Sequence, residues 1–408
     1  MKTNLEFGPI CRALLRNKVG AVLIALQIAL TMTIVVNAIF IIVERQALMQ
    51  RESGIDEANS FYLTSTGFGN DFEPKRVIEQ DLDVIRNTPG VIDAIQINAI
   101  PISGGGWSMS LTTQPGDDQE DVSTANYFVD AHGINALDLE VIAGRNFTAT
   151  DIRWRERNQP DWPDNAMITK ALAEKLFPDI PWQSVVGKTV YIGDDEPVIV
   201  TGIVDKLQAP WIGWSELENA MLSPEKMVSE STRYFIRTEP GERDRLMAEL
   251  EDTLSNAYGN RLIRNVTTVT ETRERSYRQH SAMIKILSTV MVLLTLITAM
   301  GIIGLTSFNV NRRRKQIGTR RALGASKQAI VRYFMLENVI ISTTGILLGV
   351  AMTIGLNMLL IEWFAMTALD WYYIPAGMVV LFVVGQLAVL GPALKAAATP
   401  PAIATRTV

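Results

Sequence analysis

The chain has 408 residues, a net charge of −5, 20% charged residues and 48% hydrophobic ones. The apolar residues gather into four long runs, and most of the charge lies between the first two. This pattern excludes a soluble protein, a nucleic-acid binder with a basic surface, and a collagen-like or disordered chain. The single cysteine, Cys11, excludes an internal disulfide framework and a multi-cysteine metal site.

The four apolar runs predict membrane-spanning helices, because a span needs about 20 apolar residues. The predicted spans are 19–43, 286–310, 338–361 and 374–394. The first is interpreted as an uncleaved anchor, since it is longer than the apolar part of a signal peptide and Glu44 and Arg45 follow it without a cleavage site.

The charges beside the spans predict the orientation of the chain. Basic residues dominate the N-terminus (1–18), the loop 311–337 and the tail 395–408. The short segment 362–373 has two acidic residues and no lysine or arginine. The positive-inside rule therefore places the three basic segments in the cytoplasm. It places residues 44–283 and the short loop 362–373 outside, where the aromatic residues near position 372 would lie at the membrane interface.

The segment 44–283 predicts a large α+β domain outside the membrane. It holds 39 acidic and 23 basic residues, a net charge of −16, which is interpreted as a solvated surface. Periodicity predicts two β-α-β units that share one ferredoxin-like sheet. Their strands and helices are expected at 61–66, 75–87, 91–100, 233–238, 242–258 and 262–269.

These two units are expected to form one lobe, 57–111 with 225–270, into which a β-rich lobe, 112–224, is inserted. The inserted lobe is expected to contain strands at 190–192 and 197–204 and a helix at 170–177. Polar helices at 44–56 and 271–285 are expected to act as stalks. Residues 103–106 and 151–164 are expected to be loops.

A search for catalytic chemistry predicts a non-catalytic chain. Gly187-Lys188-Thr189 resembles part of a P-loop, but Trp182 stands where the first glycine is required, and the segment enters a strand. The interpretation is a turn. His132 and His280 lack any ligand-like spacing, so no metal site is expected.

The most informative motif is RRRKQIGTRRALGAS, residues 312–326. It predicts a short helix with a mixed apolar and basic face, ended by Gly324 and followed by Ser326 as the N-cap of the next helix. A loop that is basic only because it lies on the cytoplasmic side would explain the charge. It would not explain why residues typical of a helix end and a helix start follow one another here. The candidate site residues are Arg312, Arg313, Arg314, Lys315, Ile317, Gly318, Arg320, Arg321, Leu323, Gly324 and Ser326.

The chain has this motif together with four predicted spans and a large outer domain. In this combination it resembles the MacB/FtsX-type permeases of ABC transporters, the type VII or mechanotransmission class. FVDAHGINALDLEVIAGRNFTATD, ITKALAEKLFPD, VVGKTVYIG and VIVTGIV resemble the MacB-like periplasmic core domain. PALKAAATPPAIATR resembles the C-terminal signature of the family, with fewer basic residues and without a glutamate near Ala404. The resemblance implies a multi-pass protein of the bacterial inner membrane with its large domain in the periplasm. It also implies that the lobe 57–111 with 225–270 is porter-like.

The resemblance also implies a permease subunit that exports a peptide, antibiotic or other amphiphile from the periplasm or outer leaflet. ATP and Mg would be bound by a separate ABC ATPase subunit, with no cofactor bound by this chain. Residues 312–326 would couple the two, with Ile317 and Leu323 as apolar anchors in the ATPase surface. A second permease chain, identical or homologous, is implied, and some members engage a periplasmic adaptor and an outer-membrane duct. The alternatives are an FtsX-like mechanotransmitter that controls a periplasmic partner, and a lipoprotein-releasing permease.

Small residues in two spans are candidates for close helix packing. They are Ala21, Ala25 and Ala29 in the first span and Gly345 and Gly349 in the third. Contact between two chains and packing within one chain both fit this pattern.

Overall fold

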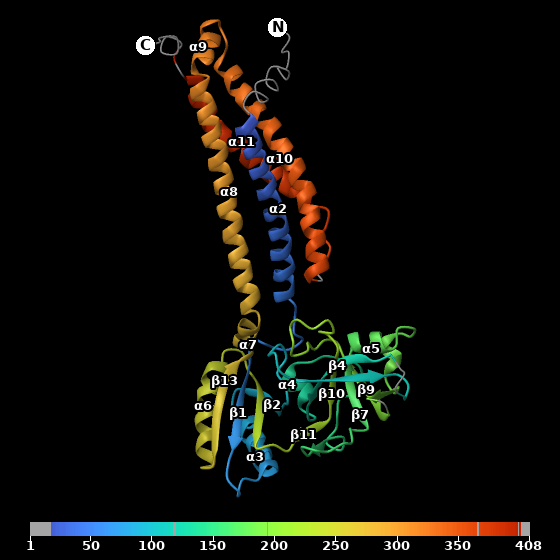
Figure 1. Ribbon diagram of the computed structural model, residues 1–408. Helices are drawn as coiled ribbons and strands as arrows, with labels where there is room; N and C mark the ends of the chain where they lie inside the picture. The colour runs from blue at the N-terminus through green and yellow to red at the C-terminus, as the bar shows by residue number, and fades with distance from the viewer. Residues whose placement is uncertain (1–17, 117–119, 194, 365–366, 399, 401–408) are drawn as a thin grey trace. The chain divides into compact units, whose positions relative to one another are not determined.

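The computed structural model describes residues 18–116, 120–193, 195–364, 367–398 and 400. It divides into two compact units, one formed by Met1–Gln50 with His280–Val408 and the other by Arg51–Gln279 (Figure 1). Cys11, nearly all of the predicted cytoplasmic N-terminus and residues 399 and 401–406 of the C-terminal signature lie outside the described residues.

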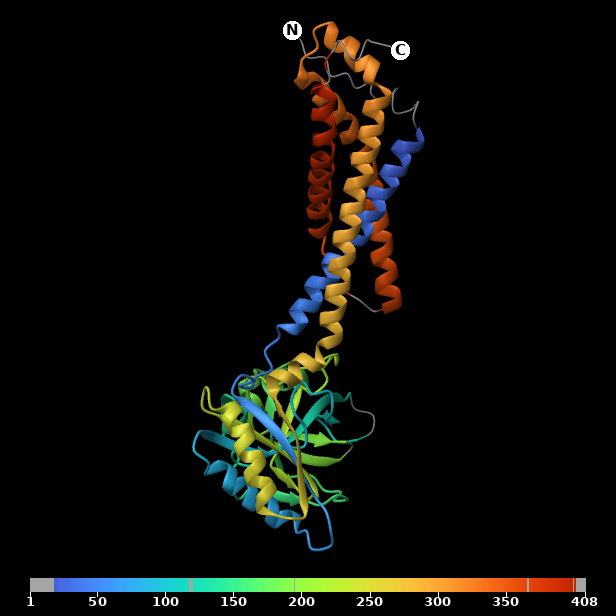
Figure 2. The ribbon, with the colours of Figure 1, turned by 90° about the vertical axis from the view of Figure 1, so that its left-hand side faces the viewer.

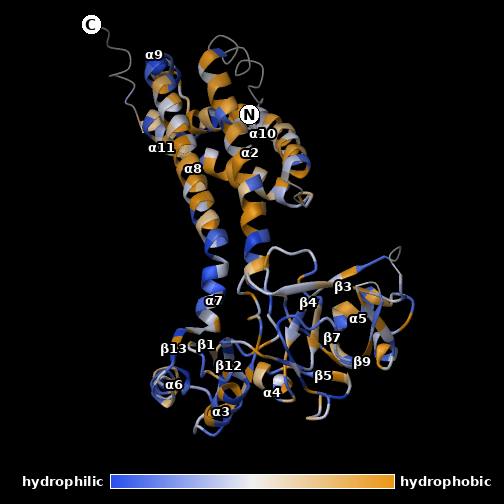
Figure 3. Ribbon diagram, turned by 60° about the horizontal axis from the view of Figure 1, so that its bottom comes forward, coloured by the Kyte–Doolittle hydropathy of each residue, from blue (hydrophilic) through white to orange (hydrophobic). Residues whose placement is uncertain are grey.

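The first unit consists mainly of long apolar helices, which Figure 3 colours as largely hydrophobic. They are α2 (Lys18–Met49), α8 (Arg278–Arg312), α10 (Lys327–Phe364) and α11 (Tyr373–Ala398). Among the described residues, these four helices are long and apolar enough to cross a bilayer, which agrees with the predicted spans. Each begins or ends beyond its apolar run, because polar residues extend the helix. The structure therefore contains less loop than the sequence suggested.

The small residues of α2 and α10 pack against one another inside the chain. A Cβ atom added at Gly345 would lie 2.7 Å from the carbonyl oxygen of Ala25. One added at Gly349 would lie 3.1 Å from the Cα atom of Ala29. Ala21 belongs to the same apolar cluster as a half-buried neighbour. These residues thus pack closely within one chain, and their contact between two chains stays a prediction.

The second unit contains a four-stranded antiparallel sheet built from two β-α-β units, as predicted. Their elements are β1 (Ser60–Gly67), α3 (Pro74–Arg86), β2 (Val91–Gln96), β12 (Ser231–Thr238), α6 (Arg243–Ala257) and β13 (Arg261–Thr268). The strand order is β13-β1-β12-β2, which is the ferredoxin-like arrangement. The second strand is shorter than predicted, because the chain leaves the sheet after Gln96 to enter the inserted lobe.

This sheet is buried on both faces. On one face, α3 and α6 pack over residues such as Phe61 and Tyr234 in a single apolar cluster, and Figure 2 shows the two helices together over the sheet. On the other face, Ile95 and Phe235 belong to a second cluster that includes Tyr127 and Leu137 of the inserted lobe. The two lobes therefore share a continuous core.

The inserted lobe is built around a seven-stranded mixed sheet and begins before the predicted boundary at 112, since residues 107–111 already belong to this sheet. Its strand order is β5-β9-β7-β10-β4-β3-β8, and β8 also pairs with β9, so that the two sides of the sheet are joined. Its elements are β3 (Trp107–Thr112), β4 (Val122–Phe128), α4 (Gly133–Leu137), β5 (Val141–Gly144), β7 (Asn165–Thr169), α5 (Lys170–Leu176), a 3-10 turn (Trp182–Val185), β8 (Thr189–Ile192), β9 (Glu196–Val204) and β10 (Ala220–Ser223).

Two expectations for this lobe are confirmed and one is wrong. The helix near 170 and the strands near 190 and 200 form where predicted. Gly187 adopts a positive φ of 84° just before β8, which agrees with a turn rather than a P-loop. The segment 151–164, however, is not all loop. It contains β6 (Arg153–Arg155), which pairs in parallel with β11 (Glu225–Met227).

Asp151 holds the start of that segment in place. Its carboxylate accepts hydrogen bonds from Arg145 at 2.7 Å and from the backbone N–H of Thr148 at 2.7 Å. The Arg145 guanidinium holds the pKa of Asp151 well below its usual value. The segment is therefore an ordered excursion.

The predicted stalks differ from the structure. α2 ends at Met49, and residues 51–56 are not helical. The segment 271–285 is divided between α7 (Val269–Ser276) and the start of α8. α7 belongs to the second unit, since Val269 is buried there and Arg273 pairs with Glu57 at 2.6 Å.

Candidate functional site

The predicted motif 312–326 forms a helical hairpin at one end of the helical unit (Figure 1). α8 ends at Arg312, the short helix α9 spans Arg314–Ala322, and α10 begins at Lys327. Only four residues, 323–326, separate α9 from α10. The predicted cytoplasmic loop 311–337 is therefore mostly helix, and such a helix is stiffer than an open loop.

The turn between α9 and α10 is specified by local backbone chemistry. The N–H of Gly324 donates to the carbonyl of Arg321 at 3.2 Å, and that of Ala325 to the carbonyl of Arg320 at 3.0 Å. This pair of bonds is the Schellman motif, which needs a left-handed residue after the helix. Gly324 supplies it with a φ of 96°. Ser326 then caps α10, since its Oγ accepts from the N–H of Ala329 at 3.1 Å.

An ion pair fastens the start of α9 to α10. Arg313 donates to Glu337 at 3.0 Å and to the hydroxyl of Tyr333 at 2.9 Å. Glu337 is 4% exposed, so its charge depends on this partner. The Cζ atom of Arg320 also lies 5.3 Å from the centre of the Tyr333 ring, a cation–π distance. Sequence reasoning missed Glu337 and Tyr333. A glutamate next to an apolar run was the available signal, because such charges require partners.

The motif residues divide into an inward and an outward set. Ile317 and Gly318 are buried, and Ile317 packs in the same apolar cluster as Ile330 and Phe334. Ile317 thus anchors α9 to its own chain and is not exposed for a partner, contrary to its expected role as an anchor in the ATPase. Leu323, in contrast, is 83% exposed.

The outward set combines Leu323 with positively charged side chains, and Figure 3 colours α9 as hydrophilic. Arg321 is half-buried and donates to the carbonyl of Ala325 at 3.1 Å. The exposed members of the predicted set are Arg312, Arg314, Lys315, Arg320, Leu323, Gly324 and Ser326. An apolar side chain within a basic surface suits a partner with an apolar pocket surrounded by acidic residues.

Two family models match this chain. A model described as the MacB-like periplasmic core domain matches residues 21–253, which is more than half of the chain. A model described as the FtsX-like permease C-terminal domain matches residues 288–401, which include the hairpin described above. The chain belongs to the MacB/FtsX family of ABC transporter permeases. The MacB-like match thus includes the inserted lobe and most of the ferredoxin-like lobe of this permease.

Individual relatives are distant. The permease is 24% identical over 230 residues to "Macrolide export ATP-binding/permease protein MacB 2" of Yersinia pestis bv. Antiqua (strain Antiqua), covering 54% of this chain and 32% of that one. It is 23% identical over 314 residues to the ABC transporter permease YknZ of Bacillus subtilis (strain 168), covering 71% of each. The chain thus spans about a third of the length of the MacB proteins it matches.

A solved structure of the periplasmic region of MacB from Actinobacillus actinomycetemcomitans is also similar. It aligns at 16% identity with a TM-score of 0.33, covering 54% of this chain and 94% of that structure.

Proposed function

We propose that this permease transmits the work of ATP hydrolysis, performed by a separate ABC ATPase, to its outer domain. The observation that carries the proposal is the hairpin α9–α10, which is fastened to its own chain by Arg313 and Ile317 and presents Leu323 outward. A stiff element held to the membrane helices is what a partner needs in order to move them. The partner would bind ATP and Mg, and a second permease chain would complete the assembly.

The substrate proposed for this transporter is a peptide, antibiotic or other amphiphile taken from the periplasm or outer leaflet. Support comes from the two-lobed outer domain and from relatives whose names state macrolide export. An FtsX-like mechanotransmitter remains the second candidate, with lipoprotein release as the third. An adaptor and an outer-membrane duct belong to the export proposal only.

The chain alone is expected to hydrolyse no ATP, because Gly187 lies in a turn before a strand instead of a phosphate-binding loop. Purification from native membranes should yield a co-purifying P-loop ATPase, and recombining the two in lipid nanodiscs should restore turnover. Empty nanodiscs with the ATPase provide the control. A complex without any ATPase, or an unchanged rate after adding the permease, would contradict the proposal.

The proposed topology in the inner membrane places α9 in the cytoplasm and residues 51–279 in the periplasm. In a Cys11→Ser background, cysteines at the exposed positions Ser255 and Gln328 test it separately. An impermeant thiol reagent added to spheroplasts should label Ser255→Cys and spare Gln328→Cys until the cells are lysed. Equal labelling of both before lysis would refute the topology.

A further inference from the structure

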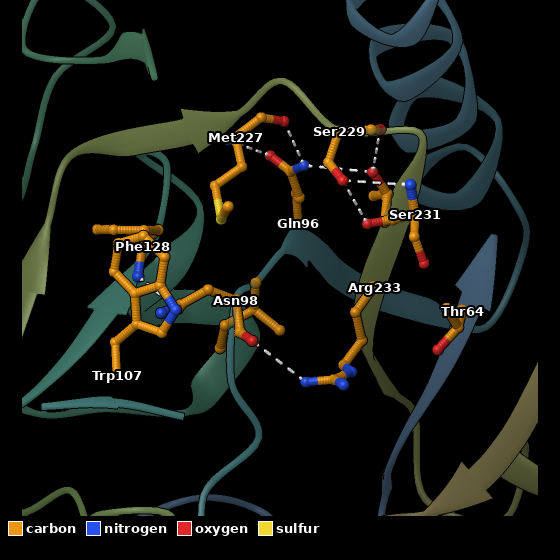
Figure 4. Close-up of a pocket in the computed structure, with 11 residues that line it drawn as sticks. Thr64, Gln96, Asn98, Trp107, Phe128, Met227, Ser229, Ser231 and Arg233 are labelled. Atoms are coloured by element: carbon orange, nitrogen blue, oxygen red, sulfur yellow. Dashed lines mark hydrogen bonds between the residues drawn. The ribbon is translucent and has the colours of Figure 1, made fainter. Parts of the chain in front are cut away.

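A cavity lies between the two lobes of the outer domain, and its walls combine a cation with aromatic groups (Figure 4). The ferredoxin-like lobe contributes Thr64 on β1 and Arg233 on β12, while the inserted lobe contributes Trp107 on β3 and Phe128 on β4. Met227 of β11 lies on the same side of the cavity as Trp107 and Phe128, across from Arg233. All of these residues belong to one compact unit, so the cavity is a feature of that unit alone.

The amide side chains in the cavity are already occupied. Gln96 exchanges two hydrogen bonds with the backbone of Met227, at 2.7 and 2.8 Å. Asn98 donates to the carbonyl of Asn126 at 2.9 Å and accepts from the N–H of Phe128 at 2.8 Å. These amide side chains bond to backbone groups in the way that a neighbouring strand would, and so connect the two lobes. They have little capacity left for a ligand.

Arg233 differs, because most of its donors are unused. One terminal nitrogen donates to the carbonyl of Asn98 at 3.2 Å, and the guanidinium lies 5.9 Å from the centre of the Tyr62 ring. Its Nε is buried without an acceptor. Within the described ranges, no carboxylate pairs with Arg233. A guanidinium offers five donors in a planar fork that matches a carboxylate in bidentate geometry, and burial strengthens such a pair.

The wall of the cavity across from Arg233 is apolar, and the cavity has room for one small group. Trp107 is 44% exposed and packs edge-on against Phe128, with ring centres 5.2 Å apart. Met227 beside them has an adaptable thioether side chain. The cavity volume of about 150 Å³ is smaller than the roughly 300–1,000 Å³ of sites for drug-sized molecules. It suits one side chain with an adjoining anionic group.

We propose that this cavity binds the C-terminal residue of a peptide. The free carboxylate pairs with Arg233, and an apolar terminal side chain packs against Trp107 and Met227. As a recognition step for an exported substrate this rests on the proposed function, but binding itself needs neither ATP nor a partner. The binding test can therefore fail while the ATPase test succeeds, and the ATPase test can fail while the peptide binds.

The test compares a free carboxylate with its amide in the full chain in nanodiscs, by ligand-observed NMR with empty nanodiscs as the blank. Acetyl-Gly-Gly-Phe is expected to bind with a Kd on the order of 1 mM, since the ligand is small and the domain is acidic. Its C-terminal amide is expected to bind at least about 10-fold more weakly, because the charged pair is lost. Equal affinities, or no binding of the acid at 10 mM, would overturn the proposal.

Variants separate the two halves of the cavity. Arg233→Gln is expected to remove the preference for acid over amide, and Arg233→Lys to retain part of it. Trp107→Ala should weaken both ligands by a similar factor and keep their ratio. Arg264→Gln, at an exposed arginine on β13 of the same sheet, should behave as wild type. An unchanged ratio in Arg233→Gln, with the near-UV circular dichroism spectrum retained, would refute the assignment of the cation.

3-Phenylpropanoate distinguishes a peptide end from any small carboxylic acid. It carries the carboxylate and the same benzyl group as a C-terminal phenylalanine but no peptide group. Binding at least about 10-fold weaker than that of acetyl-Gly-Gly-Phe supports the peptide assignment, because the backbone then contributes to affinity. Binding of equal strength would overturn it.

Discussion

The variant Leu323→Asp is expected to lose association with the ATPase and the stimulation of its turnover. Leu323 is 83% exposed, so the change leaves the interior of the permease intact. Burying a leucine in a partner contributes about 1.5–3 kcal/mol, and its loss corresponds to roughly a 10- to 100-fold weaker complex. An aspartate in the apolar pocket adds a desolvation cost. Co-purification and ATP turnover in nanodiscs measure the result.

Two control variants define what that result means. Leu323→Met retains an apolar side chain of similar volume and is expected to assemble as wild type. Gln328→Asp adds the same charge at an exposed position of α10, outside the predicted motif, and is expected to have the smaller effect. If Leu323→Asp assembles and turns over normally, the hairpin is a topological anchor and does not couple the ATPase.

The variant Asp81→Ala is expected to destabilise the ferredoxin-like lobe by about 3–5 kcal/mol, because it leaves a buried arginine without its counter-charge. Asp81 on α3 pairs with Arg261 on β13 at 2.6 Å, and both side chains are at most 2% exposed. Tyr234 donates a further hydrogen bond at 2.8 Å. Burial raises the pKa of Asp81, while Arg261 and Tyr234 oppose that shift, so the ionised carboxylate depends on them.

Hydrogen exchange of the full chain measures this cost as faster exchange of the amides in β13 and α3. The double variant Asp81→Leu/Arg261→Leu provides the control, since two apolar residues can replace a buried pair at little cost. Recovery of most of the lost protection in the double variant identifies the orphaned charge as the cause. Equal protection in the double and the single variant would show that packing, and not charge, determines the loss.

The sequence was sufficient to predict elements that are determined by residues close to one another in the chain. The spans follow from apolar length, and the two β-α-β units follow from periodicity within about 40 residues. The left-handed residue at Gly324 and the cap at Ser326 were also predicted, because turn and cap chemistry is set by neighbouring residues.

Features that depend on distant partners could not be predicted in the same way. The closure of the inserted sheet depends on β8 pairing with both β3 and β9. The inward position of Ile317 depends on Phe334 of the next helix. Helix geometry offered one warning, since residues six apart on an α-helix point about 120° away from each other, so Ile317 and Leu323 do not lie on the same side of the helix.

The point at which the inserted lobe leaves the ferredoxin-like sheet has an evolutionary consequence. The insertion departs after β2 and returns at β12, and these strands are neighbours, with Gln96 opposite Tyr234. Because its two ends lie side by side, a lobe of another size or fold can replace it without altering the strand order of the host. Homologous permeases should therefore differ in length mainly within 97–230, while the sheet and its two helices keep their lengths. One ferredoxin-like sheet can therefore carry inserted lobes of different size and fold.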